Sequence, residues 1–231
     1  PNAGYQRTEW IDADTLRVTV DLDRPTWPER FEVDDETLSA SSMLNHEDEA
    51  IQSLTSQAVD LQMLNAQSNK PTLSPLYKAE RDAAEKLRLF VRGHIERKDL
   101  SVGFASASET ARTQQGDCTE HACLLAAMLR GAGIPSRTVT GLVYADQFAG
   151  REGVFGFHMW TQAWLTDDQN KPRWVDLDAA APGQINGFDA THLALSTSTM
   201  ADDSGFNDMV PLLPLMQGMQ IKVIELAWSD D

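Results

Sequence analysis

One continuous stretch, from Gly116 to Arg130, constrains the fold more than any other part of the 231-residue chain. Asp117 is a favourable helix N-cap, and Glu120 follows three residues later, which is the spacing of a capping box. The next residues are apolar on nearly every side, a pattern that favours a buried central helix over a surface one. Gly133 and Pro135 then supply a turn and a stop. The stretch therefore predicts a rigid core helix with defined ends.

Cys118 falls at the first position of this predicted helix. A thiol there lies at the positive end of the helix dipole, which favours the thiolate over the thiol. The alternative is a small, inert core residue, which is the usual state of a free cysteine. The second cysteine, Cys123, lies about 140° around the same helix, so the pair is badly placed for a disulfide. The helix alone therefore leaves both interpretations of Cys118 open.

The composition limits the classes of partner. With a formal net charge of -16, the surface repels nucleic acids and anionic membranes, so we expect neither as a partner. No apolar run approaches the length of a membrane span, and no signal peptide is visible. A hydrophobic content of 42% suits one globular domain with an appendage.

The N-terminal third is the hardest to interpret. The chain opens at Pro1, and Tyr5 to Leu22 already resembles the interior of a fold, so we expect a processed or excised fragment. Export to the periplasm or medium and a cytoplasmic location both stay open, as does the oligomeric state. We expect residues 1–75 to form an accessory segment, or the end of a larger upstream region, with a strand at 15–22 and a helix within 46–65. Residues 76–231 would then form the main domain, which contains the predicted core helix.

The hydrophobic period changes from 3.6 to 2 after Pro135. Helices are expected over 75–97 and 106–113, strands over 136–144, 155–165, 171–178 and 219–228, and a partly helical segment over 188–198. A short polar turn joins 155–165 to 171–178, which predicts an antiparallel hairpin. The order of elements predicts an α+β fold in which helices pack on an antiparallel sheet.

A cysteine nucleophile needs a base within hydrogen-bonding reach and a third group that orients the base. The candidate bases are His121, on the Cys118 helix, and His158, within a predicted strand. Counted from the turn near Asp168, His158 and Asp178 each lie ten residues away, so the hairpin predicts them as cross-strand neighbours. Singly, each is more typical of a core histidine or a turn-forming aspartate. Together with Cys118, they make a mutually consistent catalytic set.

Four segments closely resemble the core of bacterial transglutaminase-like domains: Gly116–Ala122, Leu129–Arg137, His158–Trp160 and Trp174–Asp178. The likeness covers roughly residues 79–178 and implies a papain-like fold, in which a cysteine on a helix meets a histidine and an aspartate from adjacent strands.

By this resemblance Cys118 is the nucleophile, His158 the base and Asp178 the orienting carboxylate. One departure follows Asp178, where the family often has Asp-Pro-Thr and this chain has two alanines. Asp176 stands as the fallback orienting group.

The resemblance implies acyl transfer without a cofactor. The thiolate would attack a glutamine side-chain amide or a peptide amide of a peptide or protein substrate, and hydrolysis is expected over cross-linking. The backbone amide of Cys118 is a natural oxyanion donor. Gln114, Gln115 and Trp160 are candidates for the second donor or for substrate contacts, although Trp160 is better suited to packing or to a cleft wall than to catalysis.

Three other interpretations were weighed. A metal site from Cys118, His121, Cys123 and His158 is disfavoured because the cysteine spacing directs the two sulfurs apart. The acidic loop at 202–208 has the composition of a calcium loop but lacks a spaced bidentate glutamate. A non-catalytic protein-binding or assembly module could keep the fold. The intact Cys, His and Asp set argues against that module.

Overall fold

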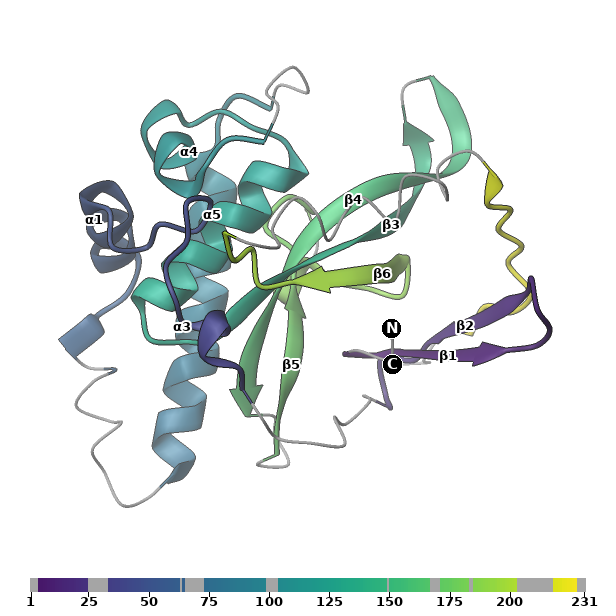
Figure 1. Ribbon diagram of the computed structural model, residues 1–231, viewed down its shortest axis with the longest axis horizontal. Helices are drawn as coiled ribbons and strands as arrows, with labels where there is room; N and C mark the ends of the chain where they lie inside the picture. The colour runs from purple at the N-terminus through teal and green to yellow at the C-terminus, as the bar shows by residue number, and fades with distance from the viewer. Residues whose placement is uncertain are drawn as a thin grey trace.

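The computed structural model describes residues 4–24, 33–62, 64, 73–98, 104–148, 150–166, 171–182, 185–202 and 218–227. In chain order the elements are β1 (Gln6–Trp10), β2 (Leu16–Val20), η1 (Asp35–Thr37), α1 (Glu49–Ala58), α3 (Leu73–His94), α4 (Ala107–Thr113), α5 (Cys118–Gly131), β3 (Ser136–Phe148), β4 (Arg151–Thr166), β5 (Pro172–Leu177), η2 (Ile185–Gly187) and β6 (His192–Ser198). The helices gather on one side of a four-stranded sheet, while the β1–β2 hairpin lies away from them (Figure 1). The α+β class predicted from the sequence is confirmed. No helix in the described part of the chain has the length and hydrophobicity that a bilayer crossing requires.

Helix α5 is the centre of the core. It packs on β4 and β3 on one side and contacts α1, α3 and α4 on the others. Every residue from Glu120 to Arg130 is buried, as the almost uniformly apolar sequence predicts. At its far end, the buried Arg130 donates to the carbonyl oxygens of Ser136 and Thr199 at 2.9 and 2.7 Å. The helix is therefore held at both ends and cannot shift without disturbing the sheet.

The sheet is antiparallel throughout, in the order β5-β4-β3-β6. Side chains alternate along β4, so Thr161, Ala163 and Leu165 face the helices, and the Thr161 hydroxyl donates to the Ala122 carbonyl at 3.0 Å. The opposite face carries a smaller cluster around Trp160, packed with residues of β3 and β6. This second face is the one on which His158 and Trp160 share a side.

Two predicted elements were wrong. Residues 188–198 were expected to be partly helical, but His192–Ser198 forms the edge strand β6 against β3. Leucine and alanine suit a helix, and here the pairing partner overrides that weak local preference. The predicted strand at 219–228 is not formed over 219–227, where the backbone joins no sheet; Trp228 lies outside the described residues. The acidic loop at 202–208 also falls outside them, apart from Asp202.

The N-terminal residues are tied to the sheet by side-chain hydrogen bonds, including one from Arg173 of β5 to the Tyr5 hydroxyl at 2.6 Å. Gln6 is buried, and its amide donates to the Ala194 carbonyl and accepts from the Ala194 amide, both at 2.8 Å. The side chain thus supplies the two hydrogen bonds that a further strand would make to the edge of β6. Further along, Leu44 and Ile51 belong to the same hydrophobic cluster as α5. The division into an accessory segment at 1–75 and a catalytic domain at 76–231 stays a prediction.

Candidate active site

The tip of α5 holds Cys118 at the first helical residue. Asp117 caps the helix by accepting from the Thr119 amide at 2.9 Å, and the Glu120 carboxylate returns the bond by accepting from the Asp117 amide, also at 2.9 Å. This is the capping box that the sequence predicts. Gly116 allows the close approach, since a Cβ there would lie 2.2 Å from the Cβ of Glu120. The half-buried thiol is therefore presented from a fixed backbone.

His158 bridges the thiol and a carboxylate. Its Nε2 lies 2.6 Å from Oδ2 of Asp178, and the ring is close enough to the Cys118 side chain for the thiol to influence its pKa. Because Nε2 faces the carboxylate, Nδ1 is the nitrogen left for the sulfur. The structure thus brings together the three residues that the sequence singled out.

The strand register that brings His158 and Asp178 together differs by two residues from the prediction. Thr161 pairs with Leu177 at the end of the β4–β5 ladder, so Asp178 lies level with Trp160 rather than with His158. A shift of two residues leaves every side chain on the same face of a sheet. The two groups therefore meet diagonally across the strands, within reach of an imidazole ring.

The Asp178 carboxylate is held by the chain that follows it. Its Oδ1 accepts from the amides of Ala180 and Ala181 at 2.7 and 3.2 Å, which leaves Oδ2 for imidazole. The Asp178 amide donates to the Asn186 carbonyl at 2.7 Å. Gly187 has a φ of +65° and packs so close that a Cβ would lie 2.2 Å from the Asp178 carbonyl oxygen, so glycine is required there. The carboxylate cannot turn away from His158 without breaking these contacts.

The electrostatics follow from this geometry. Burial is the largest single influence on His158 and would lower its pKa, but the interactions with Asp178 and Cys118 together outweigh it and raise the pKa to about 10. Burial would likewise raise the pKa of Asp178, yet hydrogen bonds from two imidazoles hold that pKa well below its usual range. An imidazolium facing a carboxylate on one side and a thiol on the other is the arrangement that stabilises a thiolate.

The second imidazole belongs to His192, which the sequence analysis missed. Its Nε2 lies 3.2 Å from the same Oδ2 of Asp178, and its ring meets the His158 ring edge-on at 5.8 Å between centroids. The mistaken helix over 188–198 hid it, because a helix gave no reason to place position 192 beside β3. If residues 192–198 are taken as a strand paired with β3, His192 falls in the same sheet as His158.

The remaining predicted residues lie as follows. Gln114 ends α4 in a left-handed conformation, and its carbonyl accepts from the amides of Glu96 and Arg97, both at 3.2 Å. Gln115 forms an isolated bridge with Arg97. The Trp160 ring is buried, and its indole N–H donates to Asp176 at 2.8 Å, which uses the one donor the ring has.

Two further candidates on α5 point elsewhere. Cys123 is fully buried, and burial raises the pKa of its thiol to about 12. His121 is also buried, its Nδ1 donates to the Asp117 carbonyl at 2.6 Å, and burial lowers its pKa.

His158, Asp178 and His192 each offer a ligand atom within 4.8 Å of the others, the only such metal-binding group of three found among the described residues. Their mutual hydrogen bonds already account for this closeness.

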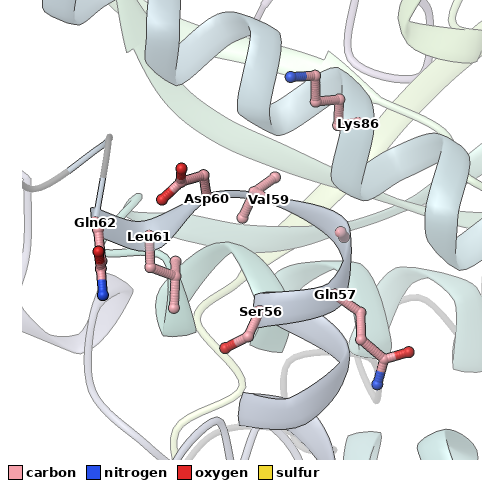
Figure 2. Close-up of a pocket in the computed structure, with 8 residues that line it drawn as sticks. Ser56, Gln57, Val59, Asp60, Leu61, Gln62 and Lys86 are labelled. Atoms are coloured by element: carbon pink, nitrogen blue, oxygen red, sulfur yellow. The ribbon is translucent and has the colours of Figure 1, made fainter.

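A depression of about 660 Å³ lies on the helical side of the molecule (Figure 2). The end of α1 and the residues after it line the depression, with Lys86 of α3 across from them. None of Cys118, His158 or Asp178 is among its described lining residues. We attach no function to it.

A helix-borne thiol that meets histidine and aspartate from the sheet defines the papain-like class of site. Residues 69–179 match the model of the transglutaminase-like superfamily. This match agrees with the resemblance to transglutaminase-like domains that the sequence shows, and it covers much the same part of the chain. A comparison with curated proteins finds no match.

Solved structures of related fold share little sequence with the chain. A candidate cysteine protease from Cytophaga hutchinsonii is 18% identical with a TM-score of 0.48, covering 73% of this chain and 47% of that one. The periplasmic domain of TgpA from Pseudomonas aeruginosa, bound to ethylmercury, is 21% identical with a TM-score of 0.36, covering 65% and 50%. Red sea bream transglutaminase is 13% identical with a TM-score of 0.40, covering 71% and 34%. The chain thus spans half or less of each of these structures, and we draw no functional conclusion from them.

Proposed function

We propose that this domain is a cysteine-dependent enzyme that transfers the acyl group of a peptide or glutamine amide through a thioester on Cys118. The observation that carries the proposal is the position of His158, whose Nε2 lies 2.6 Å from Oδ2 of Asp178 and whose ring interacts electrostatically with the Cys118 side chain. The charges of Asp178, His158 and Cys118 alternate in sign, so each charge stabilises its neighbour. Asp178 stabilises the imidazolium, and the imidazolium stabilises the thiolate.

In the proposed reaction the Cys118 thiolate attacks the amide carbonyl carbon, and the carbonyl oxygen takes up the negative charge. The amide of Cys118, at the positive end of α5, is the natural donor to that oxygen. His158 then gives its proton to the leaving amine or ammonia as the carbon–nitrogen bond breaks. Water, deprotonated by His158, attacks the thioester and releases the acid. Asp178 stays ionised throughout.

We propose water as the acyl acceptor. A half-buried thiol is reached by solvent without any dedicated binding site, whereas an amine acceptor needs a second binding surface beside the thioester. The substrate side of the proposal is a peptide or protein amide, with no cofactor in the reaction.

The test is an incubation of the chain with a glutamine-containing peptide library, with and without a primary amine, followed by mass analysis of the products. Hydrolysis predicts deamidated or cleaved peptide in both samples. Incorporation of the amine would show transfer instead of hydrolysis. Cys118→Ala is the control, and it should abolish either product.

The rate of Cys118 alkylation against pH provides a substrate-free test. A thiolate–imidazolium pair predicts rapid alkylation by iodoacetamide at pH 6, where a free thiol is almost entirely protonated. Cys118→Ala corrects for any reaction at Cys123. A thiol no more reactive than a free cysteine, and unaffected by His158→Ala, would identify a non-catalytic binding module.

A further inference from the structure

One oxygen of the Asp178 carboxylate, Oδ2, accepts hydrogen bonds from two histidines. Oδ2 lies 2.6 Å from Nε2 of His158 and 3.2 Å from Nε2 of His192. The side chains of His192 and Asp178 are almost completely buried, with exposed fractions of 2% and 1%, so water does not compete for these bonds. A single acceptor atom shared by two donors restricts the carboxylate more than either donor could alone.

The other ring nitrogen of His192, Nδ1, is held by Asp189. Its Nδ1 lies 3.2 Å from both the carboxylate Oδ1 and the backbone oxygen of Asp189, and the ring packs against Phe188 at 4.7 Å between centroids. Asp189 is fixed in turn by the amide and hydroxyl of Thr191. Both ring nitrogens of His192 therefore face acceptors, an environment that suits the doubly protonated imidazolium.

We propose that His192 is a positioning residue, which sets the orientation and charge of Asp178 and through it the state of His158. The proposal deepens the proposed function, because it assumes that His158 is the base whose orientation matters. It extends the set of interacting groups to a relay of five: Asp189, His192, Asp178, His158 and Cys118.

The charges around His192 favour this role. Asp178 and Asp189 face the two ring nitrogens, and His158 and the buried Asp176 are close enough to interact with its charge. Burial lowers the pKa of His192, but the hydrogen bonds to Asp178 and Asp189 outweigh it and the net shift is upward. A charged His192 keeps Asp178 ionised, so the carboxylate remains an acceptor for His158.

A packing role is the competing explanation, since His192 also contacts the Trp160 ring at 5.3 Å between centroids. Three substitutions separate the two roles. His192→Phe keeps a ring and removes both donors. His192→Gln keeps a donor near the place of Nε2, toward Asp178. His192→Asn keeps one near the place of Nδ1, toward Asp189, and matches Gln in polarity.

The first readout is the NMR resonance of the His158 Nε2 proton in the full chain labelled with ¹⁵N-histidine. A short hydrogen bond to a carboxylate predicts a strongly downfield proton. We expect the Gln variant to retain this signal and the Phe and Asn variants to lose it or move it upfield. This readout does not depend on any reaction of the thiol.

The second readout is the alkylation rate of Cys118 at pH 6. Loss of one charge-assisted hydrogen bond to Asp178 predicts a fall of about tenfold in the Phe and Asn variants and less than about threefold in the Gln variant. The melting temperature of each variant shows that it is folded.

The outcomes separate the proposals. If Gln and Asn behave alike in the NMR spectrum, or if Phe keeps the downfield proton, His192 only packs and the inference is overturned. If Cys118 of the unsubstituted chain alkylates no faster than a free thiol, the proposed function fails, while the NMR comparison still decides the role of His192. If Phe unfolds the chain, the Gln and Asn pair decides alone.

Discussion

Two aspartates near the end of β5 show how partners, rather than burial, set the state of a carboxylate. Asp176 and Asp178 are two residues apart and equally buried, with exposed fractions of 2% and 1%. Asp178 accepts from two imidazoles, His158 and His192. Among the residues that the structure describes, Asp176 accepts on Oδ1 from two neutral donors, the Trp160 indole at 2.8 Å and the Gln162 amide at 2.7 Å, and its Oδ2 has no hydrogen-bond partner.

As a consequence, the pKa values of the two aspartates shift in opposite directions. Burial raises the pKa of Asp176, and its neutral donors do not offset this. The two imidazoles reverse the same effect at Asp178 and lower its pKa. A sequence analysis that weighs both as orienting groups cannot separate them, because they share a face of the sheet. The difference favours Asp178 over Asp176 as the orienting carboxylate of the proposed mechanism.

The largest expected effect comes from removing the carboxylate at Asp178. Asp178→Ala leaves His158 without its orienting acceptor, so we expect the alkylation rate of Cys118 at pH 6, and any turnover, to fall roughly 10³-fold. Asp176→Asn is the matched control and should stay within about threefold of the unsubstituted chain. Equal losses in both variants would erase the distinction between the two aspartates.

A smaller effect, on stability, follows from His158. Its pKa rises from about 6.5 in the unfolded chain to about 10 in the fold, so the fold holds the proton more tightly. The resulting stabilisation is complete below pH 6.5 and is lost as the pH rises through 10. Urea unfolding at pH 6, 8 and 10 should show the advantage over His158→Gln shrinking by a few kcal/mol. A constant difference across this range would mean that His158 gains no proton affinity on folding.

The smallest effect concerns Asp176. Because its pKa is raised in the fold, its contribution to stability is most favourable below the unfolded pKa near 3.9 and declines as the pH rises through the folded value. Relative to the unsubstituted chain, Asp176→Asn should therefore gain on the order of 1 kcal/mol between pH 3.5 and pH 7 in urea unfolding. Asp178→Asn should change in the opposite direction. The same sign for both would show that burial alone governs these carboxylates.

Local patterns predicted the elements that carry the site. The capping residues Asp117 and Glu120 predicted where α5 begins, because a cap depends on residues three apart in the chain. The alternation along 155–165 predicted the face of His158, because strand geometry has a period of two. The turn at 166–170 predicted the hairpin, and the meeting of His158 with Asp178 survived an error of two residues in register since such an error preserves the face.

Other features depended on contacts that no local pattern encodes. His192 reaches Asp178 only because β6 pairs with β3 rather than forming a helix, and Gln6 covers the edge of β6 from the other end of the chain. Both depend on groups that are far apart in sequence and adjacent only after folding. The secondary-structure propensity of a segment predicts such pairings poorly, because the free energy of pairing depends on contacts with the partner strand.

By itself, the sequence determined a helix that begins on Cys118 and a hairpin whose one face carries His158 and Asp178. Only the tertiary structure decided that the pKa of Asp178 is lowered while that of Asp176 is raised, and that His192 shares the Asp178 carboxylate with His158. The physical reason is that the ionisation of a buried carboxylate depends on which donors surround it, and those donors come from strands that meet only in the fold.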